Sequence, residues 1–190
     1  FGLQQLQVED AANEAQRPKF ELDDTGCGMA LLKVLDYVES TSDVRTGQLA
    51  VFVGPWYAVT VRYGQIGDLR GIRERLETNA ELRSHGPVSV LYAILDQVVD
   101  GYLAVTDEVG IDVENLETAV FAQDRAASTP NSIYRLKREN VEVRRAVGPL
   151  VTWAHLFLAE QVPWLPHELR PYFRDIGDHI LRVNDGVESA

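Results

Sequence analysis

Residues 91–120, LYAILDQVVDGYLAVTDEVGIDVENLETAV, contain the pattern that decides the fold. From Leu91 to Val109 the apolar side chains recur in steps of 4, 3, 4, 3 and 4 residues. After a slip of one residue at Gly110 the pattern resumes at Val113. Steps of three and four place side chains on one face of an α-helix. The stretch therefore predicts a long helix with one buried face.

Two further helical patterns follow. Thr129-Pro130 fits an N-cap followed by proline at the first helical position, and a seam of apolar residues then runs from Ile133 to Ala154. We expect this helix and the preceding one, connected by residues 124–130, to form a long antiparallel hairpin of coiled-coil character. A third seam, from Leu169 to Val187, steps 4, 3, 4, 3 and 4 without interruption. We expect it to pack against the same helix of other subunits.

The sequence before residue 64 follows a strand pattern. Val, Thr, Tyr and Phe are concentrated in runs at 19–22, 29–38, 48–53 and 57–62, which Gly, Pro and Asp separate. The last two runs predict a hairpin with a tight turn at 54–56. Helices are expected before and after the strands, at 1–15 and 68–82. The fold class is therefore α/β, with a small mixed or antiparallel sheet flanked by helices and followed by the helical hairpin.

Composition narrows the range of functions. The chain of 190 residues is 45% apolar and 25% charged, as in soluble globular proteins, and its net charge is −11. Such a charge repels phosphate backbones, which argues against nucleic-acid binding and favours cation partners. Cys27 is the only cysteine, so the chain forms no internal disulfide and a reducing compartment is expected. The longest apolar stretch, 147–166, contains three prolines, and we expect the chain as given to cross no membrane.

Carboxylates offer the main candidate chemistry, because the sequence has neither a phosphate-binding glycine loop nor a histidine pair at ligand spacing. They occur as Glu9-Asp10, as Asp23-Asp24, as Asp96 with Asp100, and as Asp175 four residues before His179. Oxygen ligands suit Mg²⁺. Local spacing alone favours a solvated acidic face over a metal site. A Mg²⁺ site would have to be assembled from distant segments or from separate chains.

Several segments match a known family in order along the whole chain. They include residues 1–10, Gln16-Arg17-Pro18-Lys19, residues 52–62 and residues 96–102. The most specific are Leu136-Lys137-Arg138 with Val143-Arg144-Arg145, and Pro171-Tyr172-Phe173-Arg174-Asp175 with Asp178-His179. In these segments the chain resembles the cytoplasmic domain of CorA-type divalent-cation transporters.

The resemblance implies an architecture and a location. It implies a funnel of five subunits, each with a cytoplasmic α/β domain at 1–85, a long helical hairpin at 86–166 and the start of a stalk helix at 167–190. The family's first strands, membrane segments and Gly-Met-Asn signature are absent from this sequence, so we expect it to be the middle of a longer protein. The whole protein would reside in the cell inner or plasma membrane, with this part on the cytoplasmic side and without enzymatic activity.

The resemblance also implies regulatory metal sites between subunits. Asp10 of one subunit would face Asp175 of the next across a Mg²⁺ ion, and Glu9 and Asp96 would contribute to a second cation nearby. All four positions are acidic here, whereas Gly101 replaces an acid often found in that helix. Cytosolic Mg²⁺ would favour the closed state of the channel, and Co²⁺, Ni²⁺ or Zn²⁺ are further candidate ions.

Three other functions stay open at this point. A zinc-transporting relative would share the same cytoplasmic plan. A soluble coiled-coil interaction protein with a small sheet domain would explain the heptads and the acidity. A hydrolase using paired carboxylates and a cation would need a concave site with an activated water, for which the sequence has no motif.

Overall fold

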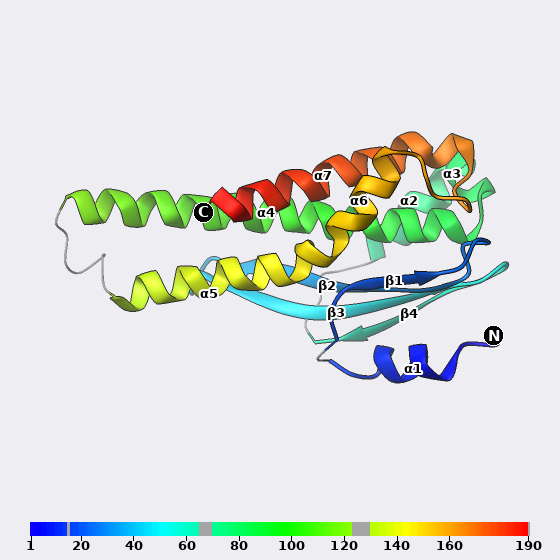
Figure 1. Ribbon diagram of the computed structural model, residues 1–190, viewed down its shortest axis with the longest axis horizontal. Helices are drawn as coiled ribbons and strands as arrows, with labels where there is room; N and C mark the ends of the chain where they lie inside the picture. Colours follow the sequence, from blue (N-terminus) through cyan, green and yellow to red (C-terminus); the bar gives the residue numbers. More distant parts are fainter. Residues whose placement is uncertain (15, 65–69, 123–129, 190) are drawn as a thin grey trace.

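A four-stranded sheet and a layer of helices make up the residues that a computed structural model describes, 1–14, 16–64, 70–122 and 130–189 (Figure 1). In chain order the elements are α1 (Gln5–Ala11), β1 (Lys19–Leu22), β2 (Gly28–Val38), β3 (Asp43–Val53), β4 (Ala58–Tyr63), α2 (Arg70–Thr78), α3 (Ala80–Ser84), α4 (Pro87–Phe121), α5 (Pro130–Val147), η1 (Gly148–Leu150), α6 (Val151–Leu158), η2 (His167–Leu169) and α7 (Arg170–Ser189). The predicted connection at 124–130 lies outside the described residues except for Pro130.

The sheet is an antiparallel meander in the order β1-β2-β3-β4. β1 has the bounds that the sequence predicts, whereas β3 begins earlier because residues 43–47 pair with residues 34–38 of β2. The predicted β3–β4 hairpin is present, and the N–H of Gly54 donates to the carbonyl oxygen of Tyr57 at 2.9 Å across its turn. The α/β fold class is confirmed, with every strand pair antiparallel.

The two faces of the sheet are covered by different elements, because successive side chains of a strand point to opposite sides. Ala30, Leu32, Leu49 and Val51 belong to the large apolar core beneath α4, α5, α6 and α7. On the other face, a small cluster is covered by α1 and consists of Ala11, Met29, Leu31, Ala50 and Phe52. Figure 1 shows α1 alone on its side of the sheet and the long helices together on the other.

Helix α4 is the centre of the helical layer. Its predicted seam is buried from Leu91 to Val109, and the hydroxyl group of Tyr102 donates to the carbonyl oxygen of Lys33 on β2. Among the described residues, it is the one helix whose length and hydropathy would suit a membrane span, and 56% of its most apolar window is buried inside the molecule.

The expectation that the seam of α7 packs on other subunits is wrong for this face. The apolar side chains of this seam, which begins in η2 and continues along α7, are at most 4% exposed within the single chain: Leu169, Phe173, Ile176, Ile180, Val183 and Val187. The backbones of α7 and α6 also pack closely, since a Cβ atom at Gly177 would lie 3.0 Å from the carbonyl oxygen of Ala154 on α6. Heptad steps indicate that one face is buried, and here α4 and α6 of the same chain bury it.

Three predicted helices have different bounds. α1 is shorter than 1–15. The helix predicted at 68–82 is divided at Asn79, whose side-chain oxygen accepts from the N–H of Leu82 and so caps α3. The helix predicted through Ala154 is interrupted by the 3₁₀ turn η1, because Pro149 has no N–H to continue the α-helical bonds.

Candidate metal-binding carboxylates

The first acidic group lies on α1. Asp10 Oδ2 is 2.6 Å from Lys19 Nζ at the start of β1, and Asp10 Oδ1 accepts from Gln16 Nε2 at 2.8 Å. The side chain of Asp10 is 25% exposed, so solvent and small ions reach it. Glu9 is exposed beside it and accepts from Gln5 Nε2 at 2.9 Å.

The ammonium group of Lys19 therefore already neutralises part of the charge of this acidic group. The same ammonium group also lies 2.6 Å from Glu21 Oε1. Burial alone would lower the pKa of Lys19, but the hydrogen bonds to Asp10 and Glu21 outweigh it and raise that pKa above its ordinary value. A metal ion at Asp10 would have to compete with this ammonium group.

The second acidic group lies where α4 and α7 pack side by side. Asp96 on α4 has a side chain only 14% exposed and is paired with Arg75 of α2. Arg75 also donates to the hydroxyl oxygen of Tyr92 at 2.9 Å. Burial raises the pKa of Tyr92 to about 12. Asp96 is thus held in place by a cation of its own chain.

Asp100 and His179 connect this group to α7. His179 Nδ1 is 3.8 Å from Asp100 Oδ1, and His179 Nε2 is 3.8 Å from Asp175 Oδ1. Burial and the negative charge of Asp96 raise the pKa of Asp100, and Asp175 acts in the same direction. The carboxylates of Asp96 and Asp175 therefore repel that of Asp100, whereas His179 and Arg75 act in the opposite direction.

A third acidic pair, Asp23-Asp24, belongs to the β1–β2 turn. The Asp23 carboxylate accepts from the N–H and hydroxyl groups of Thr25 and from the N–H of Cys27, and these bonds lower the pKa of Asp23. Gly28 closes the turn at φ +140°, where a Cβ atom would lie 1.9 Å from the carbonyl oxygen of Glu21. The carboxylate of Asp23 therefore stabilises the β1–β2 turn.

Within one chain the four predicted ligands do not converge. Glu9 and Asp10 lie on the α1 side of the sheet, and Asp96 and Asp175 lie in the helical layer on its opposite side (Figure 1). In the described part of the chain, no three His, Cys, Asp or Glu side chains form a metal-binding group. A cation that used both pairs of carboxylates would have to lie between two copies of the chain.

Sequence reasoning left Asp100 and His179 out of the predicted site. Both stand one helical turn from a predicted ligand, Asp100 after Asp96 and His179 after Asp175. This spacing of four was visible in the sequence. The packing of α4 against α7, which brings the two turns within 3.8 Å, was not.

Comparison with known proteins supports the resemblance. The chain is 28% identical over 191 residues to the cobalt/magnesium transport protein CorA of Thermotoga maritima, all of this chain matching 54% of that protein. The chain spans about half the length of the curated relatives it matches.

Solved structures agree on the fold. The soluble domain of CorA from Methanocaldococcus jannaschii superposes with a TM-score of 0.78 at 19% identity, covering 100% of this chain and 74% of that one. The cytoplasmic domain of ZntB from Vibrio parahaemolyticus gives a TM-score of 0.62 at 15% identity, with 99% and 73% covered. The model of one family, CorA-like Mg²⁺ transporter protein, matches residues 1–190. Because that match spans the whole chain, the chain belongs to the family of CorA-like Mg²⁺ transporter proteins.

Proposed function

We propose that this chain is the cytoplasmic regulatory part of a channel that carries Mg²⁺, with Co²⁺ and Ni²⁺ as further cargo, and that cytosolic Mg²⁺ favours its closed state. The observation that carries the proposal is the division of the carboxylates between two faces. α1 presents Glu9 and Asp10 on one side of the sheet, and α4 and α7 present Asp96 and Asp175 on the other. Neighbouring copies in a ring can bring both groups to one ion, whereas a single copy cannot.

The physical mechanism is repulsion relieved by a cation. Two acidic groups that approach across an interface repel each other, and a divalent cation between them reverses the sign of the interaction. Carboxylate oxygens are the ligands that Mg²⁺ accepts, usually one or two together with several waters. A cation that binds the closed ring more tightly than the open one shifts the population toward the closed ring.

The proposal includes an assembly and a location. It treats residues 1–85 as the α/β domain, 86–166 as the helical hairpin and 167–190 as the start of the stalk. It also assigns a homopentamer on the cytoplasmic side of the cell inner or plasma membrane, with no catalytic step. Support comes from membership of the CorA-like family and from the likeness to a CorA soluble domain.

The alternative proposal, that the chain belongs to a zinc-transporting relative, can be judged from the types of ligand atom present. His179 between Asp100 and Asp175 supplies a nitrogen donor, which Zn²⁺ accepts more readily than Mg²⁺ does. The other candidate ligands are all carboxylates, which favour Mg²⁺. The assay of the proposal therefore compares Mg²⁺, Co²⁺, Ni²⁺ and Zn²⁺ in parallel.

Melting and light scattering under increasing Mg²⁺ test the proposal. At a tenfold excess over the dissociation constant, Mg²⁺ should raise the melting temperature of a chain of this size by about 3–6 °C and should increase the mean particle mass. Na⁺ at matched ionic strength should do much less, because it only screens the charges. The double variant Asp10→Asn/Asp175→Asn should lose the Mg²⁺-specific part.

Asp185→Asn is the matched control, since it removes an exposed carboxylate elsewhere on α7. It should keep the full response to Mg²⁺. If the double variant responds to Mg²⁺ as the wild type does, Asp10 and Asp175 are a solvated acidic face and the regulatory assignment fails.

A further inference from the structure

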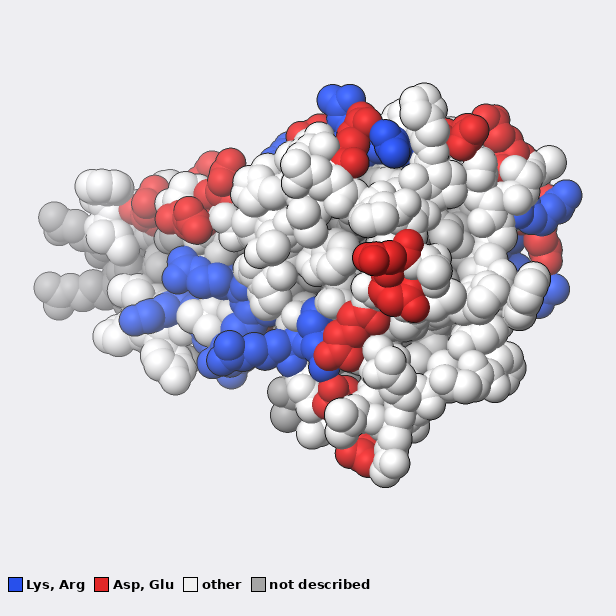
Figure 2. All heavy atoms as spheres, turned by 45° about the vertical axis from the view of Figure 1, so that its right-hand side comes forward, with Lys and Arg blue, Asp and Glu red and all other residues white. Residues whose placement is uncertain are grey.

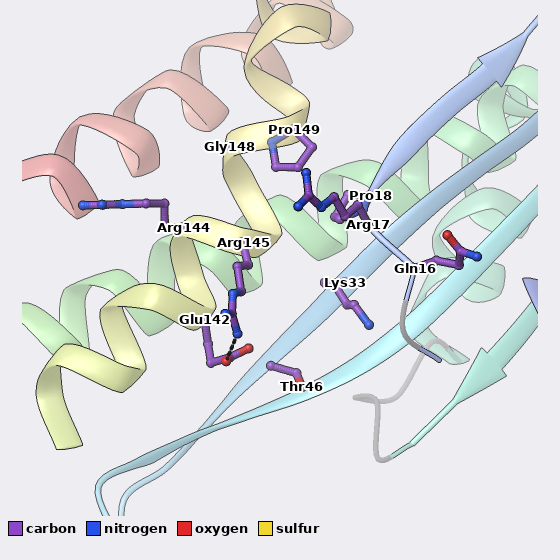
Figure 3. A pocket seen from close by; sticks show the side chains of 10 residues that line it. All are labelled: Gln16, Arg17, Pro18, Lys33, Thr46, Glu142, Arg144, Arg145, Gly148 and Pro149. Atoms are coloured by element: carbon purple, nitrogen blue, oxygen red, sulfur yellow. Dashed lines mark hydrogen bonds and ion pairs between the residues drawn. The ribbon is translucent and has the colours of Figure 1, made fainter. Parts of the chain in front are cut away.

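A hollow of about 660 Å³ lies between the end of α5 and the adjacent strands β2 and β3. Figure 3 shows Arg17 above it, Lys33 of β2 on the sheet side, Thr46 of β3 below it and the pair Arg145 and Glu142 of α5 opposite Lys33. Segments far apart in sequence thus bring four cationic side chains into the lining of one hollow: Arg17, Lys33, Arg144 and Arg145. None of these residues belongs to the carboxylate groups described above.

The cations of the hollow are poorly neutralised by the protein itself. Among the described residues, Arg17 has no carboxylate within ion-pair distance. Lys33 Nζ donates to two neutral oxygens, the carbonyl of Glu14 at 2.7 Å and Oε1 of Gln48 at 3.4 Å. Arg145 pairs with Glu142 at 3.0 Å. The four cationic side chains in the lining of the hollow, Arg17, Lys33, Arg144 and Arg145, thus outnumber the two carboxylates that act on Lys33, those of Glu142 and Glu14.

This arrangement is unusual for so acidic a chain. With 29 Asp and Glu against 18 Lys and Arg, a cation readily finds an acidic neighbour. Figure 2 nevertheless shows Lys and Arg side chains gathered into one group over the α5 region. Burial lowers the pKa of Lys33, with Glu142 and Glu14 acting in the opposite direction. An anion in the hollow would favour the charged form of Lys33 and would give Arg17 a partner of opposite charge.

We propose that this hollow binds a soluble phosphate-bearing anion with at least two negative charges, such as pyrophosphate or the polyphosphate group of a nucleotide. Arg17 and Arg145 offer planar guanidinium groups that bind phosphate oxygens in pairs, and Lys33 adds a point charge from the sheet. The local excess of about two positive charges matches a dianion better than a monocarboxylate. The net charge of −11 still disfavours long phosphate backbones, which would extend beyond the hollow over an acidic chain. The proposal is independent of the regulatory Mg²⁺ sites.

Calorimetric titration of the 190-residue chain with pyrophosphate, in 50 mM NaCl without divalent cations, tests the proposal. The wild type should bind with a dissociation constant below about 1 mM, and binding should weaken as NaCl is raised to 300 mM. Arg17→Gln/Arg145→Gln should weaken binding at least tenfold, because both guanidinium groups are lost. Circular dichroism melting checks that the variant is folded, as expected for substitutions at exposed side chains.

Arg73→Gln is the matched control, since Arg73 is an 85% exposed arginine on α2 that pairs with Glu77. It should bind pyrophosphate as the wild type does. Failure of the wild type to bind any phosphate anion, or equal binding by the wild type and the double variant, would overturn the proposal. Co-sedimentation with vesicles of phosphatidylcholine containing phosphatidylglycerol separates the two sources of phosphate. If the wild type pellets, the double variant does not and pyrophosphate fails to bind, the phosphate belongs to a lipid headgroup and the soluble ligand is excluded.

Discussion

The two faces of the sheet differ in how much protein covers them. The helical face is buried under four helices, and its core continues without a break from Phe20 to Val187. The opposite face is covered by the seven residues of α1, with a core cluster of five buried side chains. Yet each face carries one group of candidate metal-binding carboxylates. One half of the proposed site is therefore rigidly mounted, and the other half rests on a short helix whose position a bound ion can influence.

Truncating one buried phenylalanine on each face of the sheet should reveal the largest difference in stability between the two faces. Phe173 on α7 and Phe52 on β3 are both at most 2% exposed. The ring centroid of Phe173 lies 5.1 Å from that of Phe157 and 5.9 Å from that of Trp164, so a cavity there is surrounded by aromatic rings that cannot collapse into it. Phe173→Ala should cost about 3–5 kcal/mol of unfolding free energy. Phe52→Ala should cost less, because α1 can settle into the space.

Urea unfolding of both variants, followed by circular dichroism, measures the difference. Equal losses of unfolding free energy would mean that α1 is held as firmly as the helical layer, and the contrast between the faces would be wrong.

Glu139 of α5 is a weak point of the helical face. This side chain is 1% exposed, its two carboxylate oxygens have no hydrogen-bond partner among the described residues, and the nearest cation is Arg135 Nε at 3.6 Å. Burial raises the pKa of Glu139 to about 7, Asp112 and Asp43 act in the same direction, and Arg135 and Arg138 oppose them. The folded state therefore binds a proton that the unfolded state, with a pKa near 4.5, has already released.

The sign of the pH dependence follows from this difference. The contribution of Glu139 to stability is fully present below about pH 4.5 and is lost as the pH rises through 7, on the order of 3 kcal/mol in all. Glu139→Gln should remove this loss, so the variant should be more stable than the wild type at pH 8 and similar to it at pH 4.5. Urea unfolding at several pH values measures both. Glu114→Gln, an exposed substitution on α4, should follow the wild-type profile, and a Glu139→Gln profile parallel to the wild type would contradict the assignment.

Most of the strands and helices could be predicted because their signals are local. Alternation and turn residues placed β1 at its observed bounds, and steps of three and four located α4 and α7. What buries a face is not local, which is why the seam of α7 was assigned to other subunits although α4 and α6 cover it. The candidate site divides in the same way. Acidic residue types were visible, but the Arg75 partner of Asp96 and the approach of His179 to Asp100 depend on tertiary packing.

The smallest expected effect on stability comes from a substitution on the α1 side of the sheet. Lys19→Met keeps the apolar stem of the side chain and removes the ammonium group that lies 2.6 Å from Asp10. Because Lys19 and Asp10 are 31% and 25% exposed, the loss should be only about 0.5–1 kcal/mol at pH 7. The folded pKa of Lys19 is raised above 10.5, so the difference between wild type and variant should persist below that pH and vanish as the pH rises through the folded pKa.

Lys19→Met should also respond to lower concentrations of Mg²⁺. This response tests whether the ion binds on the α1 side of the sheet. In the wild type a metal ion at Asp10 must displace the ammonium group of Lys19, so removing that competitor should lower the Mg²⁺ concentration for half of the melting shift about threefold to fivefold, the equivalent of about 0.6–1 kcal/mol. Lys137→Met, on α5, is the control and should leave the Mg²⁺ titration unchanged. A Lys19→Met chain that needs as much Mg²⁺ as the wild type would mean that the ion does not bind at Asp10. The α1 half of the proposed site would then have no role in sensing.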